Sequence, residues 1–236
     1  AFRGFVWGKG GFLPLLLASF VALYFELIVI RYLSTEIRIF AYLKNLALIA
    51  SFFGIGLGMV LEKPPALLKR LFPLIAGVLF LLIRFAPVLR LTHLPIPTLG
   101  YQVFTDNPLA PSGHGGIPWA ILMFLIYLAA VPGIMYLVVS FFAVLGGTLA
   151  EHLKEFGPLQ GYGLNLVGSL AGIVAFTVLS FMGAPPGIWV LIGFLAVTPF
   201  FLRQWPALGA FALIVCATAV PEAHTYWSPY YRITLQ

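Results

Sequence analysis

Charged residues are scarce in this chain of 236 residues. Thirteen basic and seven acidic side chains make up only 8% of it, whereas an ordinary soluble domain has roughly 25%. Because 61% of the residues are hydrophobic, a water-soluble fold would lack the polar side chains needed to cover its surface. This composition excludes a soluble globular enzyme and predicts an integral membrane protein. We expect it in a bacterial or archaeal inner membrane, with the lipid bilayer as its main partner.

Cysteine is almost absent, and the common motifs of soluble enzymes are missing. The only cysteine is Cys216, so an internal disulfide and a cysteine-based metal cluster are excluded. No histidine spacing matches a metal site, and no Walker loop, Gly-rich dinucleotide turn, G-x-S-x-G or H-E-x-x-H sequence occurs. The net charge of +6 fits loops beside anionic head groups rather than nucleic-acid binding. We expect no metal, no cofactor, no nucleic-acid partner and no catalytic residue in this segment.

Long apolar runs fill most of the chain. A hydrocarbon core of about 30 Å needs roughly 20 helical residues, and the alternating pattern of a membrane β-barrel is absent. The sequence therefore predicts an all-α fold, a polytopic integral membrane helical bundle of about seven transmembrane helices. The expected spans are 12–33, 39–61, 71–90, 117–150, 160–182, 186–203 and 206–221.

The sequence allows more than one number of spans, and the orientation of the bundle depends on that number. Pro132 interrupts the stretch 117–150, which is either one long kinked span or two short spans, giving eight in total. With seven spans, the basic residues favour a cytoplasmic N-terminus and an external C-terminus. The first run is expected to be a retained span, since no cleavage pattern follows it. The tryptophans fall at expected span ends, as in an interfacial belt, and they are Trp7, Trp119, Trp189, Trp205 and Trp227.

Glycine pairs spaced four residues apart indicate close helix packing. Gly54 and Gly58 form one such pair, and Gly168 and Gly172 form another. Asn165 lies on the same helical stripe as Gly168 and Gly172. We expect this stripe to pack tightly against another span and Asn165 to hydrogen-bond across the interface.

A charged residue well inside a span costs about 2.5–3.5 kcal/mol at a helix centre and needs a partner or a function. Glu26, Lys44 and Arg84 lie at a similar depth by residue count. We expect the Glu26 carboxylate to contact one of the two cations. The patch is either a structural salt bridge or a substrate or proton site. In the second case the candidate substrate-binding residues also include Asn165 and Tyr162.

Four stretches resemble membrane-bound spermidine synthase-like proteins. These are YFELI at 24–28, GIGLGMVL at 54–61, GYGLNLVGSLAG at 161–172 and WSPYYRI at 227–233. In that family a polytopic membrane domain precedes a polyamine aminopropyltransferase-like or methyltransferase-like domain. The resemblance implies that the third stretch matches the family's spanning motif at Tyr162, Asn165, Gly168 and Gly172.

The resemblance divides the chain into a transmembrane domain, 1–221, and the start of a synthase-like domain, 222–236. The implied function is to anchor that C-terminal domain and to present an amphiphilic or cationic substrate to it. A transporter or exporter of a small cationic or amphiphilic solute is one alternative. A non-catalytic accessory subunit, packed with other membrane subunits or as a homo-oligomer, is another. Because Pro221 and Pro229 break helical hydrogen bonding, we expect the segment from Trp227 to leave the membrane as an extended strand.

Overall fold

The structure is mostly helical. The computed structural model describes residues 11–89, 91, 116–202, 204–220, 225–228 and 232–234, and 82% of it is helix. The helices are α2 (Phe12–Glu36), α3 (Arg38–Tyr42), α4 (Lys44–Val60), α5 (Ala66–Arg84), α6 (Gly116–Leu153), α7 (Pro158–Phe181), α8 (Pro186–Val197), the 3-10 turn η1 (Thr198–Phe200) and α9 (Trp205–Ala219). Two strands follow, β1 (Thr225–Trp227) and β2 (Arg232–Thr234).

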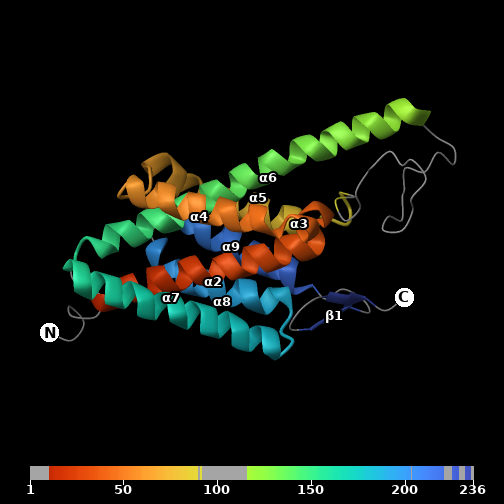
Figure 1. Cartoon of the computed structure of the whole chain (residues 1–236). Helices are drawn as coiled ribbons and strands as arrows, with labels where there is room; N and C mark the ends of the chain where they lie inside the picture. The colour runs from red at the N-terminus through yellow and green to blue at the C-terminus, as the bar shows by residue number, and fades with distance from the viewer. Residues whose placement is uncertain are drawn as a thin grey trace.

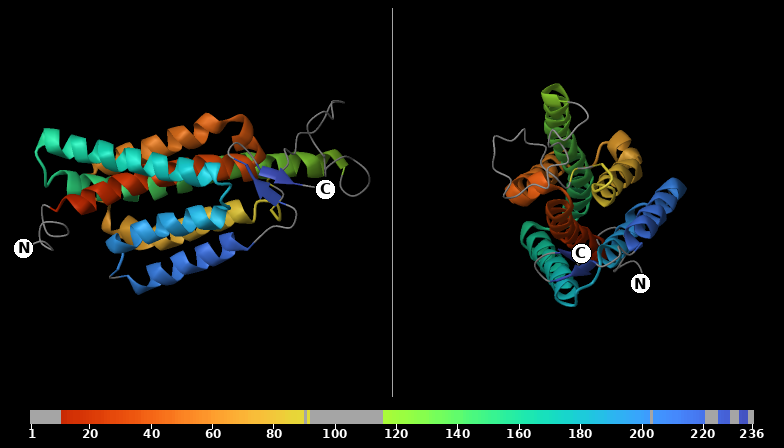
Figure 2. Two further views of the ribbon diagram at one scale, coloured as in Figure 1. Left: turned by 90° about the horizontal axis from the view of Figure 1, so that it is seen from below. Right: turned by 90° about the vertical axis from the view of Figure 1, so that its right-hand side faces the viewer.

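The helices form an elongated bundle around α2 (Figure 1). Helices α2, α5, α7 and α9 run in one direction, and α4, α6 and α8 run in the opposite one. Seen end-on, α2 lies in the middle, with α7, α4, α6 and α8 packed around it (Figure 2). The strands lie at the end of the bundle where α2 finishes, which we call the hairpin end.

Four of the described helical segments are long and apolar enough to cross a membrane. They are α2, α5, Leu128–Leu153 of α6, and α7. Three further apolar segments are shorter: Lys44–Val60, Pro186–Phe200 and Trp205–Ala219. A helix of 15 residues rises only about 22 Å, and prolines at 186 and 206 fix the starts of the last two. About seven transmembrane helices were expected, and the described residues contain four that are long enough to span and three shorter apolar segments.

Helix α6 is continuous through Pro132 over 38 residues. Of the two alternatives for 117–150, one long span or two short spans, the structure therefore contains the single long helix. Proline at this position removes one backbone hydrogen bond and bends a helix, but the apolar residues on both sides keep the same helical run. In contrast, the expected span 39–61 is divided, because the backbone leaves helical geometry at Leu43 between α3 and α4.

Phenylalanine rings fill the core between the helices. Phe25 of α2 makes ring contacts with Phe80 of α5, Phe141 of α6 and Phe194 of α8, with centroids 5.2 to 5.9 Å apart. All four side chains are at most 2% exposed. Trp189 is fully buried as well, so its expected place in an interfacial belt is wrong. Its ring packs instead against those of Phe176 and Trp227, with centroids 5.4 Å and 5.0 Å away.

Both glycine pairs form close helix contacts, as expected. A Cβ added to Gly168 or Gly172 of α7 would lie 2.5 Å or 2.6 Å from a backbone oxygen of α2. One added to Gly54 would lie 2.6 Å from the Val139 oxygen of α6, and one added to Gly58 would overlap the Ala143 oxygen. The missing side chains allow these backbones to approach each other directly.

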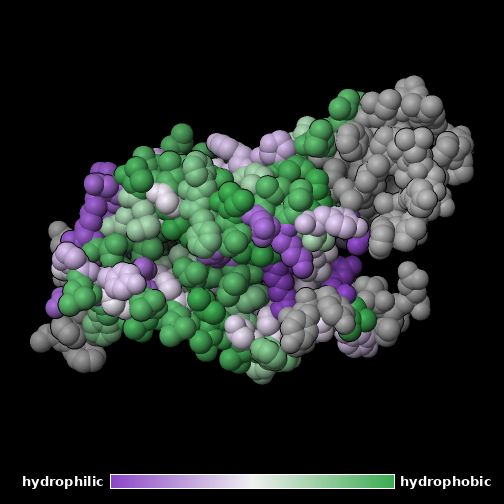
Figure 3. Space-filling view, viewed as in Figure 1, coloured by the Kyte–Doolittle hydropathy of each residue, from purple (hydrophilic) through white to green (hydrophobic). Residues whose placement is uncertain are grey.

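On the face seen in Figure 3, apolar side chains cover most of the middle of the bundle, and strongly hydrophilic ones gather toward its two ends. At the end opposite the hairpin, Lys154 contacts Glu62 at 2.5 Å and Lys69 contacts Glu151 at 3.7 Å. This distribution is typical of a protein whose middle faces lipid and whose ends face water.

Candidate functional site

The chain leaves the last helix as a β-hairpin that lies against the hairpin end of the bundle. Helix α9 ends at Ala219, and β1 pairs antiparallel with β2, with Tyr226 opposite Ile233 and Trp227 opposite Arg232. The expected extended segment after the last helix is confirmed. Residues 229–231 of the WSPYYRI stretch lie outside the described residues.

Arg31 of α2 joins the hairpin to the bundle. Its guanidinium donates hydrogen bonds to the Ser180 hydroxyl of α7 and to the Ser228 carbonyl beside β1. The guanidinium carbon also lies 4.7 Å from the centre of the Trp189 ring. A guanidinium is suited to this position because its planar face stacks on an indole while its edge donates hydrogen bonds.

Glu36 and Arg232 form a second connection. Both carboxylate oxygens of Glu36, the last residue of α2, accept hydrogen bonds from Nη1 of Arg232, at 2.7 and 2.8 Å. The Glu36 side chain is 2% exposed and that of Arg232 is 21% exposed. Opposite charges removed from water at this range interact more strongly than a surface pair. Trp227 adds an aromatic contact, with its ring 5.0 Å from Trp189 and 6.3 Å from Tyr32.

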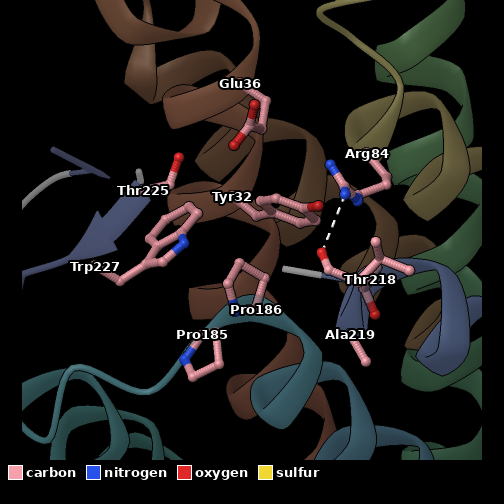
Figure 4. Close-up of a pocket in the computed structure, with 10 residues that line it drawn as sticks. Tyr32, Glu36, Arg84, Pro185, Pro186, Thr218, Ala219, Thr225 and Trp227 are labelled. Atoms are coloured by element: carbon pink, nitrogen blue, oxygen red, sulfur yellow. Dashed lines mark hydrogen bonds between the residues drawn. The ribbon is translucent and has the colours of Figure 1, made fainter. Parts of the chain in front are cut away.

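A cavity of about 120 Å³ lies between the hairpin and the helix ends (Figure 4). The Glu36 carboxylate and the Arg84 guanidinium both border it, and the Tyr32 ring lies between them with its hydroxyl toward Arg84. Its lining consists of Tyr32, Glu36, Arg84, Pro185, Pro186, Thr218, Ala219, Val220, Thr225 and Trp227.

Arg84 caps the carbonyl end of α9. Its Nε donates to the Ala217 oxygen and its Nη2 to the Val220 oxygen, both at 3.1 Å. The last carbonyls of a helix lack partners within the helix and carry its negative dipole end. The guanidinium of Arg84 therefore fixes the point at which the chain turns from α9 toward β1.

The cavity suits water or a ligand of a few heavy atoms. Its volume is well below the roughly 300–1,000 Å³ of sites for drug-sized ligands. A carboxylate and a guanidinium in one lining present both an acceptor and a donor, as needed for a small polar or zwitterionic molecule. Among the described residues, His, Cys, Asp and Glu do not gather in a group of three that would hold a metal ion.

The expected contact of Glu26 with Lys44 or Arg84 is not formed. Glu26 is 3% exposed in the core, and its Oε1 lies 3.4 Å from the Ser51 hydroxyl. Lys44 is exposed at the start of α4, and Arg84 is engaged with α9. Residue count gave these side chains a similar depth, but α4 begins at Lys44 and α5 ends at Arg84. Glu26 lies ten residues before the end of α2, so it is deeper in the bundle than either cation.

The remaining expected site residues lie on α7, away from the cavity. Tyr162 is 65% exposed. Asn165 Oδ1 is buried and has no hydrogen-bond partner within the described part of the chain, so the expected bond across the interface is not formed there. A role for Lys44, Tyr162 or Asn165 in substrate binding stays a prediction.

The contacts of Arg31 and of Glu36 with the hairpin were not predicted from the sequence. Arg31 and Glu36 stand near the end of the first apolar run, and that position was a signal for an interface with water. Arg232 lies 196 residues after Glu36, and no sequence pattern relates the two.

Comparisons with known proteins find no match among protein-family models, curated proteins or solved structures. The functional argument therefore depends on the geometry of the hairpin end and on the sequence.

Proposed function

We propose that this chain is a membrane-embedded helical domain that holds and orients its C-terminal segment at one membrane surface. The observation that carries the proposal is the attachment of the hairpin to α2. Arg31 binds the backbone beside β1, and Glu36 binds Arg232 on β2. A segment that simply followed the last helix would need no such contacts, because its covalent link already tethers it.

The spanning arrangement is part of the proposal. Seven helical segments alternate in direction along one axis (Figure 1). If all of them cross the bilayer, the hairpin lies on the side opposite the N-terminus. The three shorter segments then require a locally thinner bilayer, to which the longer helices adapt by tilting. The cost is fractions of a kcal/mol per Å of mismatch between helix length and bilayer thickness.

The identity of the anchored part follows from the sequence resemblance. We propose a membrane domain of a spermidine synthase-like protein, in which the hairpin begins an aminopropyltransferase-like or methyltransferase-like domain. Support comes from the extended conformation of Trp227, Arg232 and Ile233, which belong to the stretch 227–233 that carries the resemblance. Aminopropyl transfer to a polyamine and methyl transfer, measured on the full-length protein, test this part separately from the anchoring.

Hydrogen exchange of the hairpin amides tests the anchoring. In Glu36→Gln, Arg232 loses the charge of its partner, so we expect exchange across residues 225–234 to rise at least severalfold, since removing one member of a buried pair costs about 3–5 kcal/mol. The matched control is Glu151→Gln, which removes the exposed pair with Lys69 and should leave hairpin exchange unchanged. Unchanged hairpin protection in Glu36→Gln would contradict the proposal.

A further inference from the structure

Glu26 lies deep within the helix at the centre of the bundle. It follows Phe12 by 14 residues and precedes Glu36 by ten, so at 1.5 Å per residue it lies about 21 Å from one end of α2 and about 15 Å from the other. Its side chain is 3% exposed. In a hydrocarbon core of about 30 Å this depth is close to the bilayer centre.

No cationic side chain compensates a charge at this position among the described residues. The ionisable side chains described on helices packed against α2 are Arg38, Tyr42, Lys44, Lys69, Arg70, Arg84, Tyr136, Glu151, His152 and Tyr162. Lys69 faces Glu151, Arg84 donates to α9, and His152 lies against Phe200. The others are exposed. On α2 itself, Tyr24 donates to the Trp189 oxygen, Arg31 donates to Ser180 and Ser228, and Glu36 pairs with Arg232.

Ser51 is the hydrogen-bond partner of Glu26, and its geometry favours a proton on the Glu26 carboxyl group. Ser51 is fully buried on α4, and its Oγ lies 2.9 Å from the Leu48 carbonyl and 3.4 Å from Glu26 Oε1. A hydroxyl has one proton to donate, and a carbonyl oxygen only accepts. The shorter distance assigns the Ser51 proton to Leu48. Ser51 Oγ then donates at most weakly to Glu26 Oε1, at 3.4 Å, and a carboxyl group that carries a proton can donate it to the free lone pair of Ser51 Oγ.

We propose that Glu26 is a proton-binding site in the middle of the bundle, held as a neutral carboxylic acid that donates to Ser51 Oγ. Proton binding removes the charge that the buried position cannot solvate, since an isolated ion in an apolar medium is far more costly than a neutral polar group. The second oxygen, Oε2, has no hydrogen-bond partner among the described residues, which is tolerable for a neutral acid and unfavourable for an anion. This site is independent of the anchoring function.

The proposal predicts how substitutions at Glu26 behave. A glutamine side chain is neutral and donates through its amide group, so Glu26→Gln should preserve the Ser51 contact and leave the melting temperature close to that of the original protein. An ion pair at Glu26 would predict the opposite, because the glutamine variant would leave a buried cation unpaired.

Infrared spectroscopy of the purified full chain, reconstituted in phosphatidylcholine vesicles at neutral pH, tests the proposal. A protonated carboxyl group has a C=O stretching band that a carboxylate lacks. We expect this band in the original protein, its loss in Glu26→Gln, and its retention in Glu36→Gln, the matched control on the same helix. In Ser51→Ala the band should move to higher wavenumber, because the acid loses its acceptor.

The outcomes separate the alternatives. Absence of the band at neutral pH, or an undiminished band in Glu26→Gln, would overturn the proposal. If Glu26→Gln does not fold, the Ser51→Ala shift decides, since a carboxylic acid elsewhere in the protein would not respond to this change. Hydrogen exchange of the hairpin, which reports the anchoring, should be the same in all Glu26 and Ser51 variants.

Discussion

Arg84 is a cation in an apolar helix whose hydrogen-bond partners are backbone carbonyls and not a carboxylate. The sequence placed it near a carboxylate, whereas the structure directs it to two carbonyl oxygens at the end of α9. A helix C-terminus offers partial negative charge without a carboxylate. An ion pair was expected because only side-chain charges are visible in a sequence.

Replacing Arg84 should destabilise the end of α9. We expect Arg84→Met to lower the free energy of unfolding by about 2 kcal/mol, since each hydrogen bond from a charged donor contributes about 1.5–3 kcal/mol and one of the two lies at the surface. Arg84→Lys should recover part of the loss, because an ammonium group cannot reach both carbonyls in the same geometry. Thermal unfolding in detergent measures both. Arg38→Met, an exposed arginine near the same end, serves as the control and should have little effect.

The Glu62 carboxylate at the opposite end gives a prediction on pH. A hydrogen bond donated by Lys154, together with its charge, lowers the pKa of Glu62 from its ordinary value. A carboxyl group with a lowered pKa in the folded state stabilises the fold above its unfolded pKa, and the contribution is lost as the pH falls through the folded pKa. The group is exposed, so we expect a small effect that 0.5 M salt removes. Comparing acid unfolding of Glu62→Gln with the original protein at low and high salt checks this, and an equal difference at both salts would contradict it.

At the scale of elements, α4 packs against α6 and α7 packs against α2 through glycine. The four-residue spacing predicted close contacts but not the partners, because a small-residue stripe fits any smooth helix face. Neither pair is adjacent in the chain, so only the packing of the whole bundle decided which helix fills each stripe.

Alanine substitutions in pairs should distinguish glycines that touch a neighbouring helix from glycines that face open space, by their effect on stability. A Cβ at Gly58 would overlap the α6 backbone, whereas one at Gly56 on the same helix meets nothing within 4 Å. We expect Gly58→Ala to destabilise by about 1–3 kcal/mol through overpacking and Gly56→Ala to be neutral or stabilising by up to about 1 kcal/mol through helix propensity. Gly168 and Gly163 of α7 form a second pair of the same kind. Equal melting temperatures within a pair would show that the helices are not in close contact.

At the scale of the whole molecule, the position of α9 in the bilayer decides whether this one of the three shorter segments is a span. Cys216, the only cysteine, is exposed on α9 beside an apolar groove lined by α8 and α9. If α9 crosses the membrane, this thiol faces lipid.

Thiol labelling in opened membrane sheets tests that position. We expect Cys216 to react with an apolar maleimide and to resist a charged maleimide until the membranes are dissolved in detergent. The control is Lys63→Cys in a Cys216→Ser background, because position 63 is exposed in the loop between α4 and α5 and should react with both reagents. Rapid labelling of Cys216 by the charged reagent in intact sheets would place α9 outside the hydrocarbon region and reduce the number of spans.

The sequence by itself determined the membrane-type composition, the helical class, the close contacts at glycine pairs and the strand after the last helix. These properties are local, since they follow from apolar run length, side-chain size and proline geometry over a few residues. The tertiary structure decided the continuity of α6 through Pro132, the partner of Arg84, the isolation of Glu26 and the pairing of Glu36 with Arg232. A residue count fixes neither the exact ends of each helix, and hence the depth of a side chain, nor the direction in which that side chain points around the bundle, because both are fixed only when the helices pack.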